Sequence, residues 1–120
     1  MKDYKDLEVW KKSMDLVVDI YKLIKQLPKE ETYALSDQIR RSAVFIPSNI
    51  AEGASRKSTK EFVNFLYITL GSSSELETQL ILAREIGYVN NENLKQILAD
   101  LIIIRKMIHS LINYLRGKQK

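Results

Sequence analysis

The sequence predicts an all-α protein, a single antiparallel four-helix bundle with up-down-up-down topology. Four segments have apolar residues at alternating spacings of three and four, the period of an α-helix, and none shows a convincing period-two alternation typical of a strand. Only a few residues separate these segments, so consecutive helices should pack side by side in opposite directions. We therefore expect one domain over residues 1–120, with helices at about 7–26, 31–54, 59–86 and 91–116.

The first two segments have clear apolar stripes. The stripe of the first consists of Leu7, Trp10, Met14, Val17, Tyr21 and Ile24. Pro28 ends this helix, because proline cannot continue a helix and biases the preceding residue away from helical angles. The stripe of the second consists of Ser36, Ile39, Ala43, Ile46 and Ile50. Pro47 lies inside this helix, and we expect a bend at which Ser48 and Asn49 hydrogen-bond the freed backbone groups.

The third and fourth segments begin and end with capping signals. Ser58 and Glu61 have the spacing of a capping box, and Gly87 is placed to end the third helix in a left-handed cap. Asn90 or Asn91 can cap the fourth helix. The third stripe consists of Phe62, Leu66, Thr69, Ser73, Leu76, Leu80 and Ala83. The fourth consists of Leu94, Ile97, Leu101, Ile104, Ile108, Leu111 and Leu115.

The fourth segment carries more apolar residues than one buried stripe requires. Leu98, Ile102 and Ile112 fall on one flank of the stripe, and Ile103 and Met107 fall on the other. A helix with a single buried stripe is normally polar elsewhere, and monomers rarely expose a large apolar patch. We therefore predict a homo-oligomer whose interface includes these five side chains.

The positive charge of the chain is concentrated in two stretches, although the net charge is only +4. Residues 40–60 contain five basic side chains and one acidic one, and residues 105–120 contain five basic side chains and no acidic one. Such segregation is typical of proteins that bind polyanions, although two ordinary basic helix faces would give the same pattern. Charge alone therefore leaves two interpretations open, a nucleic-acid-binding surface and two ordinary basic helix faces.

Five basic residues in and after the second segment are the candidate nucleic-acid-binding groups. They are Arg40, Arg41, Arg56, Lys57 and Lys60. The planar fork of arginine holds two phosphate oxygens at once, and the two lysines flank a helix start, whose free N–H groups also favour an anion. The alternatives are a solvated turn and a surface pair between Glu52 and Arg56. For the second basic stretch, we favour a simple interaction with the negative end of the helix dipole.

Phe45 falls on the same side of the second helix as Arg41 and Arg56. An exposed aromatic ring there could stack on an unpaired base. We favour the alternative, a contact between copies of the chain, and add Phe45 to the predicted oligomer interface.

Catalytic and metal chemistry have little support in the sequence. Residues 72–74 are serines close to Glu75 and Glu77, but a serine nucleophile needs an activating base, and the chain's one histidine, His109, lies on another helix. Small serines more readily let helices approach, and Glu75 is placed to pair with an arginine across the bundle. One histidine and no cysteine leave no recognisable metal site, so we expect no enzyme activity and no cofactor.

The absence of cysteine also excludes disulfides and fits a reducing compartment. The longest apolar run is far too short to span a membrane, and the N-terminal residues lack the apolar core of a signal peptide. We therefore expect a cytoplasmic protein that does not bind membranes.

One continuous motif and several shorter blocks resemble a known family. Residues 38–56 read QIRRSAVFIPSNIAEGASR, and matching blocks occur at 7–10, 27–33, 61–66 and 71–80. In these blocks the sequence is similar to the bacterial proteins encoded in 23S rRNA intervening sequences. Nearly the whole chain is covered, and the central motif is specific. Two positions depart from the family pattern: Phe45, where a small residue is more usual, and Ala34, where glycine is common.

The resemblance implies an antiparallel four-helix bundle that assembles into a ring-shaped homopentamer without established catalytic chemistry. The family includes the accessory protein of diversity-generating retroelements, which binds nucleic acid and a reverse transcriptase through a basic surface. We therefore expect binding of structured RNA or DNA by a homo-oligomer. The alternative is a protein-interaction scaffold, for example for a reverse transcriptase. A remote alternative is a small helical-bundle ribonuclease, but the spacing of Arg105 and His109 falls short of the spacing in such nucleases.

Overall fold

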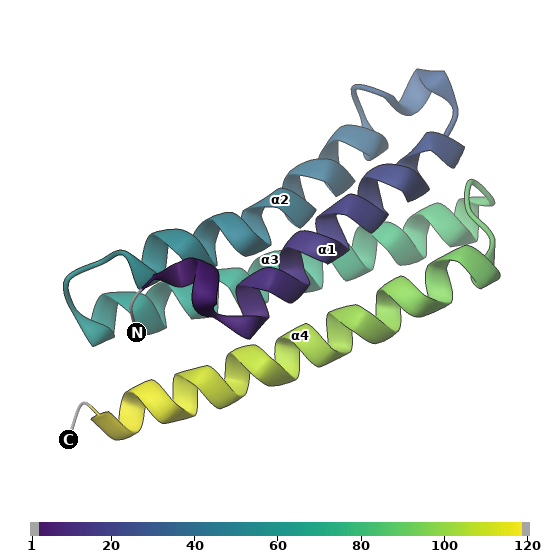
Figure 1. The fold of residues 1–120 in the computed structure, drawn as a ribbon. Coiled ribbons are helices and arrows are strands. Elements are labelled where there is room, and N and C mark those ends of the chain that lie inside the picture. The colour runs from purple at the N-terminus through teal and green to yellow at the C-terminus, as the bar shows by residue number, and fades with distance from the viewer. Residues whose placement is uncertain (1–2, 119–120) are drawn as a thin grey trace.

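The structure is a computed structural model that describes residues 3–118 as a bundle of helices (Figure 1). Its long helices are α1 (Glu8–Leu23), α2 (Leu35–Ala54), α3 (Thr59–Ile86) and α4 (Asn91–Lys118). Short 3-10 turns cover Tyr4–Asp6, Ile24–Gln26 and Lys29–Glu31. The described part of the chain contains no strand, which confirms the all-α prediction. Within it, no helix has both the length and the apolar character needed to cross a lipid bilayer.

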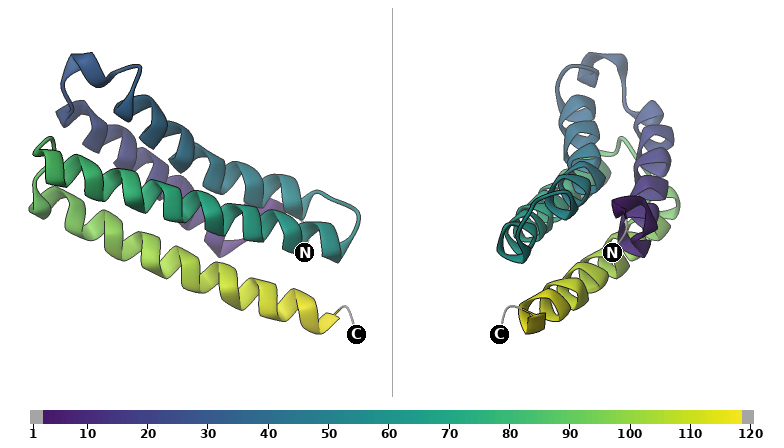
Figure 2. Two further views of the ribbon diagram at one scale, coloured as in Figure 1. Left: turned by 180° about the vertical axis from the view of Figure 1, so that it is seen from behind. Right: turned by 60° about the vertical axis from the view of Figure 1, so that its left-hand side comes forward.

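Each long helix packs against two others. Helix α1 contacts α2 and α4, and α3 also contacts α2 and α4, in a molecule with extents of 49 × 24 × 20 Å. Both ribbon views show the α2–α3 turn at the same end of the bundle as the N-terminus and the C-terminus (Figures 1 and 2). Segments from the beginning, middle and end of the sequence therefore meet at one end of the molecule.

Ser58 and Gly87 cap the two ends of α3 at the predicted positions. The hydroxyl of Ser58 accepts a hydrogen bond from the Glu61 N–H at 3.1 Å. Gly87 follows the helix with a φ of 95°, the left-handed conformation that glycine adopts without steric cost. The side chain of Asn90 accepts a hydrogen bond from the Asn93 N–H at 2.9 Å and caps α4. Helix α3 therefore occupies the predicted range.

The start of α2 differs from the prediction. The helix begins at Leu35 rather than near residue 31, because Glu31 ends a separate 3-10 turn. The Glu31 carboxylate accepts a hydrogen bond from the Leu35 N–H at 3.2 Å. The Ala34 side chain cannot cap the helix, so the Glu31 carboxylate provides the capping hydrogen bond instead. Farther along α2, near the buried Pro47, the Asn49 side chain donates to the Phe45 carbonyl at 2.8 Å. The carbonyl that proline leaves without its helical donor is that of Ala43, four residues before Pro47, so this bond is not the predicted compensation for the proline.

The core is formed by apolar side chains from all four helices. Its largest fully buried members are Leu16, Ile20, Ile39, Ile46, Ile50, Leu66, Leu76, Leu80, Leu94, Leu101, Ile104 and Ile108. The predicted stripe of α3 is buried throughout. In α1, however, the buried stripe is displaced by one residue from the prediction, which leaves Met14 and Tyr21 exposed. This helix has apolar residues on two adjacent stripes, so its periodicity alone could not identify the innermost one.

The predicted oligomer interface on α4 is only partly exposed. Ile112 is 2% exposed and belongs to the core, so its assignment to an outer flank was wrong. An α-helix drifts by about 20° per heptad relative to a strict 3–4 pattern, and this drift brings Ile112 inward in place of Leu111. Leu98 and Met107 are partly buried against the core. Ile102 and Ile103 remain 45% and 44% exposed, and Phe45 on α2 is 51% exposed.

Gly53 sets the distance between α2 and α3. A Cβ atom at this position would lie 2.6 Å from Phe65 Cβ and 3.1 Å from a ring carbon of Phe62. Contacts below 3.0 Å essentially never occur at real Cβ atoms, and the Phe65 Cβ cannot move without the α3 backbone. The absence of a side chain at Gly53 is therefore required for this helix pair to pack as it does.

We predict that Gly53→Ala lowers the unfolding free energy by about 1–3 kcal/mol, because the added methyl group overpacks the α2–α3 contact. Gly71→Ala is the matched control. Gly71 lies in α3, and an added methyl group there would meet open space, so this change should raise stability by about 0.5–1 kcal/mol. Urea denaturation of the wild type and both variants measures the difference. Equal stability of Gly53→Ala and the wild type would contradict the packing argument.

The α3–α4 turn is tied to the segment that precedes α2. The Tyr88 hydroxyl donates a hydrogen bond to the Glu31 carboxylate at 2.8 Å. This bond, together with burial and the charges of Glu31 and Glu30, raises the pKa of Tyr88 above its ordinary value of 10.0. The folded state therefore holds the phenol proton more tightly than the unfolded state, and its stabilising contribution is complete below the ordinary pKa.

We expect this contribution to be lost as the pH rises through the folded-state pKa of Tyr88. The difference in unfolding free energy between the wild type and Tyr88→Phe should therefore shrink above about pH 10. Tyr33→Phe makes the same chemical change at a side chain that is 94% exposed, and its difference from the wild type should not vary in this way. If the difference in unfolding free energy between the wild type and Tyr88→Phe stayed constant as the pH rose above about 10, the hydrogen bond would not be coupled to folding.

Candidate nucleic-acid interface

The α2–α3 turn presents Arg56 and Lys57 at one end of the bundle. The turn is tight, because the Arg56 N–H donates to the Gly53 carbonyl at 3.2 Å and Ser58 already caps the next helix. Arg56 pairs with Glu52 at 2.7 Å, which is the surface pair that the sequence offered as an alternative. The Arg56 guanidinium also lies 5.0 Å from the centre of the Phe65 ring. The pair is solvent-exposed, so it contributes little energy and leaves the arginine available to another anion.

Lys57 and Lys60 are exposed on the turn and on the first helical turn of α3. Within residues 3–118, neither lysine forms an ion pair. Their charges are therefore not neutralised by a neighbouring carboxylate in this part of the molecule.

The C-terminal end of α4 lies beside the α2–α3 turn and forms a groove with it. The groove has a volume of about 310 Å³. Its lining residues are Leu7, Ala54, Arg56, Lys57, Ser58, Thr59, Phe62, Leu111, Tyr114, Leu115 and Lys118. Three cations from two distant parts of the sequence thus border one groove with an apolar floor. We call it the basic groove.

Two basic residues of α4 contribute to this end of the molecule. The Lys118 ammonium lies 4.9 Å from the centre of the Tyr114 ring. Arg116 donates to the Tyr67 hydroxyl at 2.9 Å, with its guanidinium 5.8 Å from the centre of that ring. The sequence alone favours an interaction of these cations with the negative end of the helix dipole. It does not show that they lie beside the α2–α3 turn, because that position depends on how α4 packs. Lys120 of the same stretch lies outside the described residues.

Arg40 and Arg41 do not join the basic groove. They lie near the start of α2, about 15 residues before Arg56, which corresponds to roughly 22 Å along a helix. Both pair with Asp37, at 2.6 Å for Arg40 and 3.3 Å for Arg41. With Tyr21 and Phe45 they border a separate groove between α1 and α2. The five predicted basic residues therefore form two separate surfaces.

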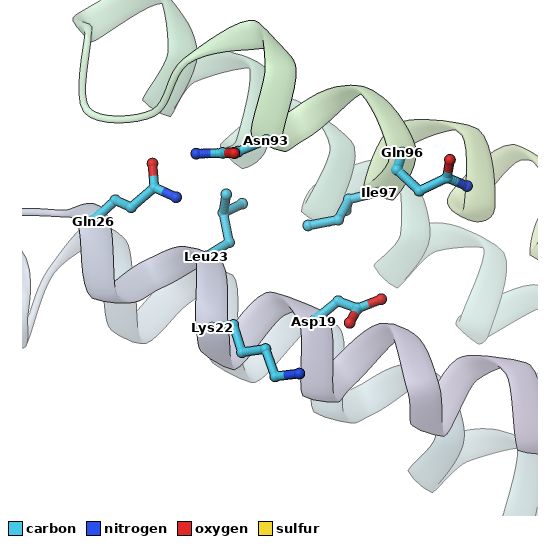
Figure 3. A pocket seen from close by; sticks show the side chains of 7 residues that line it. All are labelled: Asp19, Lys22, Leu23, Gln26, Asn93, Gln96 and Ile97. Atoms are coloured by element: carbon cyan, nitrogen blue, oxygen red, sulfur yellow. The ribbon is translucent and has the colours of Figure 1, made fainter.

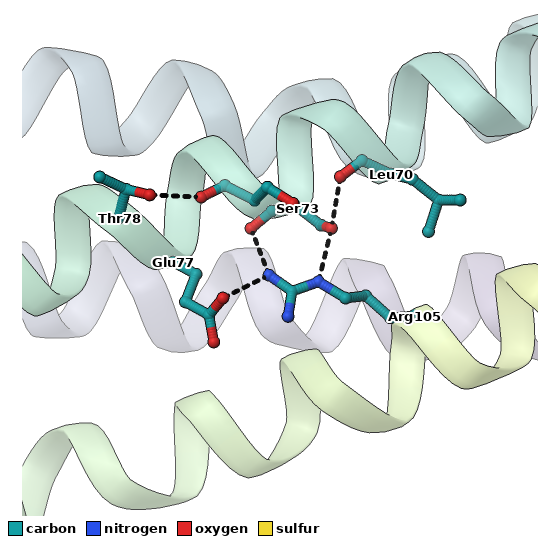
Figure 4. A network of polar contacts seen from close by, with 6 residues as sticks. Leu70, Ser73, Glu77, Thr78 and Arg105 are labelled. Carbon is teal, nitrogen blue, oxygen red and sulfur yellow. Dashed lines mark hydrogen bonds and ion pairs between the residues drawn. The ribbon is translucent and has the colours of Figure 1, made fainter.

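The Arg105 side chain connects α4 to α3 and does not point into solvent as a free cation. Figure 4 shows its guanidinium reaching from α4 to Ser73 and Glu77 on α3. It donates to the Ser73 hydroxyl at 2.9 Å, to the Ser73 carbonyl at 3.0 Å and to the Glu77 carboxylate at 2.9 Å. The carboxylate that pairs across the bundle is thus Glu77 rather than Glu75.

The serines of α3 contribute to packing. Ser72 and Ser73 are buried, and the Ser73 hydroxyl donates to the Leu70 carbonyl at 2.7 Å while it accepts from Arg105. His109 is exposed on α4, so it does not share this buried site. Across residues 3–118, no group of three histidine, cysteine or acidic side chains is arranged to hold a metal ion.

A third groove lies at the opposite end, between α1 and α4 (Figure 3). Its volume is about 330 Å³, and Leu23 and Ile97 lie between the two helices. Its other lining residues are Asp19, Lys22, Gln26, Asn93 and Gln96. One cation beside one carboxylate makes it a poorer site for a polyanion than the basic groove.

The comparisons with known proteins agree with this architecture. The family model for the 23S rRNA-intervening sequence protein matches residues 5–110. The chain belongs to the 23S rRNA-intervening sequence protein family. A crystal structure of a protein of unknown function from the S23 ribosomal protein family of Bacteroides thetaiotaomicron VPI-5482 is 34% identical, with a TM-score of 0.80. The match covers 87% of this chain and 97% of that one. The comparison with curated proteins found no match.

In this 23S rRNA-intervening sequence protein, the two departures from the family pattern fall at described positions. Ala34 precedes α2, where Glu31 provides the hydrogen bond that caps the helix. Phe45 is exposed beside Arg41, on the surface that is separate from the basic groove. The unusual aromatic residue therefore leaves the basic groove unchanged.

Proposed function

We propose that this 23S rRNA-intervening sequence protein is a non-enzymatic, cytoplasmic nucleic-acid-binding protein. In this proposal an antiparallel up-down-up-down bundle is the subunit of a homo-oligomeric ring, and phosphates of structured RNA or DNA bind at the basic groove. The observation that carries the proposal is the convergence of Arg56, Lys57 and Lys118 on one groove. Closely spaced cations around a concave surface attract a polyanion more strongly than the same charges dispersed.

The remaining candidate residues have supporting positions in this proposal. Lys60 lies at the start of α3, just beyond the groove, and extends the path of a bound backbone. Arg40 and Arg41 form a second phosphate contact on α2. A long nucleic acid can reach it, and so can a nucleic acid bound at the basic groove of a neighbouring subunit. Because Asp37 partly neutralises both arginines, their contribution is smaller than that of the groove.

Binding dominated by phosphate contacts should weaken steeply with salt. We predict that Arg56→Ala/Lys57→Ala/Lys118→Ala weakens binding to an RNA hairpin and to a DNA duplex, and lowers the salt slope by about one for each phosphate that is no longer bound. Fluorescence anisotropy at low and physiological salt measures both quantities. The matched control is Lys25→Ala/Lys29→Ala/Lys95→Ala, which removes the same charge from exposed sites at the opposite end of the bundle.

Two outcomes would count against this prediction. Absence of binding at low salt by the folded wild-type protein would overturn the nucleic-acid proposal. Equal losses in the groove variant and the control would show that net charge, rather than the basic groove, determines affinity.

The proposed ring needs two different faces that fit each other, because identical subunits in a ring of more than two meet head to tail. We assign these two faces to two exposed apolar areas. One is formed by Ile102 and Ile103 on α4, bordered by Leu98 and Met107, and the other is formed by Phe45 on α2 with Tyr21 on α1. The number of five subunits comes from the family resemblance.

We predict that Ile103→Glu and Phe45→Glu each convert the oligomer into monomers, because each would bury a charge in one of the two faces. Leu82→Glu is the control at an exposed apolar side chain of α3 outside these areas. Light scattering coupled to size-exclusion chromatography measures the mass of each protein. A monomeric wild type, or an unchanged oligomer in both variants, would contradict the proposed faces.

A protein-interaction scaffold is the second candidate function. The apolar floor of the basic groove, which includes Phe62, Leu111 and Leu115, is compatible with side chains of an acidic protein, for example a reverse transcriptase. Nucleic acid remains the preferred ligand, because exposed aromatic rings accompany the cations at this end.

A further inference from the structure

The basic groove has features that phosphate binding alone does not require. Phe62 and Leu115 are buried in its floor, and Leu111 is partly buried. Tyr114 lines the groove and is 59% exposed. A phosphate is strongly hydrated and gains nothing from an apolar floor or an aromatic wall, whereas a nucleobase is flat and largely apolar on its two faces. The lining therefore suits a base as well as its phosphate.

Two basic side chains of α4 near this end of the molecule each lie over an aromatic ring. Lys118 lies over Tyr114, and Arg116 lies over Tyr67, whose hydroxyl it also contacts. Both tyrosines are exposed. Surfaces that bind single-stranded nucleic acid combine basic side chains that follow the backbone with aromatic side chains on which successive bases stack. The pairing of ring and cation at Tyr114 has this composition.

The cost of unpairing favours an unpaired strand. The groove, with a volume of about 310 Å³, lies within the size range of small-ligand sites and can receive one base. In a duplex the bases are stacked inside the helix, so a tyrosine can stack on one only after it has been unpaired, at a cost of a few kcal/mol. An unpaired base avoids this cost.

We propose that Tyr114 is a stacking platform for an unpaired base, and that the basic groove therefore prefers single-stranded RNA or DNA, or an unpaired loop, over a duplex. Arg56, Lys57 and Lys118 hold the phosphates that flank this base. The inference rests on the proposed function, because it specifies the class of nucleic acid that the same groove binds. Phe45, the stacking residue considered from the sequence, lies beside arginines that are already paired with Asp37 and is the weaker site.

The experiment compares three probes by fluorescence anisotropy: an oligothymidylate of about twelve nucleotides, an abasic strand of equal length and a duplex of equal length. The abasic strand keeps the phosphates and lacks the bases, so it separates stacking from charge. Tyr114→Ala should weaken binding of the oligothymidylate by about 5- to 150-fold and leave the abasic strand and the duplex nearly unchanged. Tyr114→Phe keeps the ring and should retain most of the affinity.

The matched control is Tyr33→Ala, which removes an exposed tyrosine at the opposite end and should change none of the three affinities. Thermal unfolding checks that each variant is folded. Arg56→Ala should weaken binding of the oligothymidylate and the abasic strand alike, because it removes a phosphate contact.

The outcomes distinguish this inference from the proposed function. Absence of binding to every probe would overturn the proposed function itself. Equal affinity for single strand and duplex, with no effect of Tyr114→Ala, would overturn the inference and leave the proposed function standing. Equal weakening of the oligothymidylate and the abasic strand would show that Tyr114 does not act by stacking. Poly-glutamate that binds as tightly as the oligothymidylate, with the same loss in Tyr114→Ala, would overturn the inference in favour of an acidic protein partner.

Discussion

The close packing of α2 against α3 is the constraint on which the rest of the structure depends. At Gly53 the α2 backbone lies so near Phe65 that even a methyl group would not fit. Small buried side chains such as Ser42, Ala43 and Thr69 lie along the same two helices. Because these helices flank the turn with Arg56 and Lys57, their separation also determines the position of the basic side chains. The requirement for a small residue at Gly53 is thus a requirement of the candidate site as well as of the core.

Polar contacts then position α4 against α3. The Arg105 guanidinium satisfies a backbone carbonyl, a hydroxyl and a carboxylate at once, in a partly buried region where leaving any of them unpaired would be costly. Arg116 adds a contact near the C-terminal end of α4 through the Tyr67 hydroxyl. These ties keep the end of α4 beside the α2–α3 turn, so that Lys118 and Tyr114 can share a groove with Arg56.

The basic side chains differ in whether a carboxylate within the protein already neutralises their charge. Arg105 is used within the bundle, and Arg40 and Arg41 share the carboxylate of Asp37. Lys57 and Lys60 form no ion pair within the described residues. A count of basic residues along the sequence treats all of these charges alike. Arg56 at the turn is likewise paired, with Glu52, but Lys57 and Lys60 beside it have no such partner in residues 3–118. These two lysines make the turn a better candidate for binding a polyanion than the pair of arginines near the start of α2.

The helical class, the family and the ends of α3 could all be predicted from the sequence, because periodicity and the capping signals of Ser58 and Gly87 depend on neighbours within a few residues. The position of Lys57 beside a turn was predictable for the same reason, whereas the sequence placed Arg56 on the face of the second helix that carries Arg41. Three other features required the packed structure: which of two adjacent apolar stripes of α1 is buried, the place of Ile112 in the core, and the position of Lys118 and Tyr114 beside Arg56. Each of these depends on how one helix packs against another, and local periodicity carries no information about the partner.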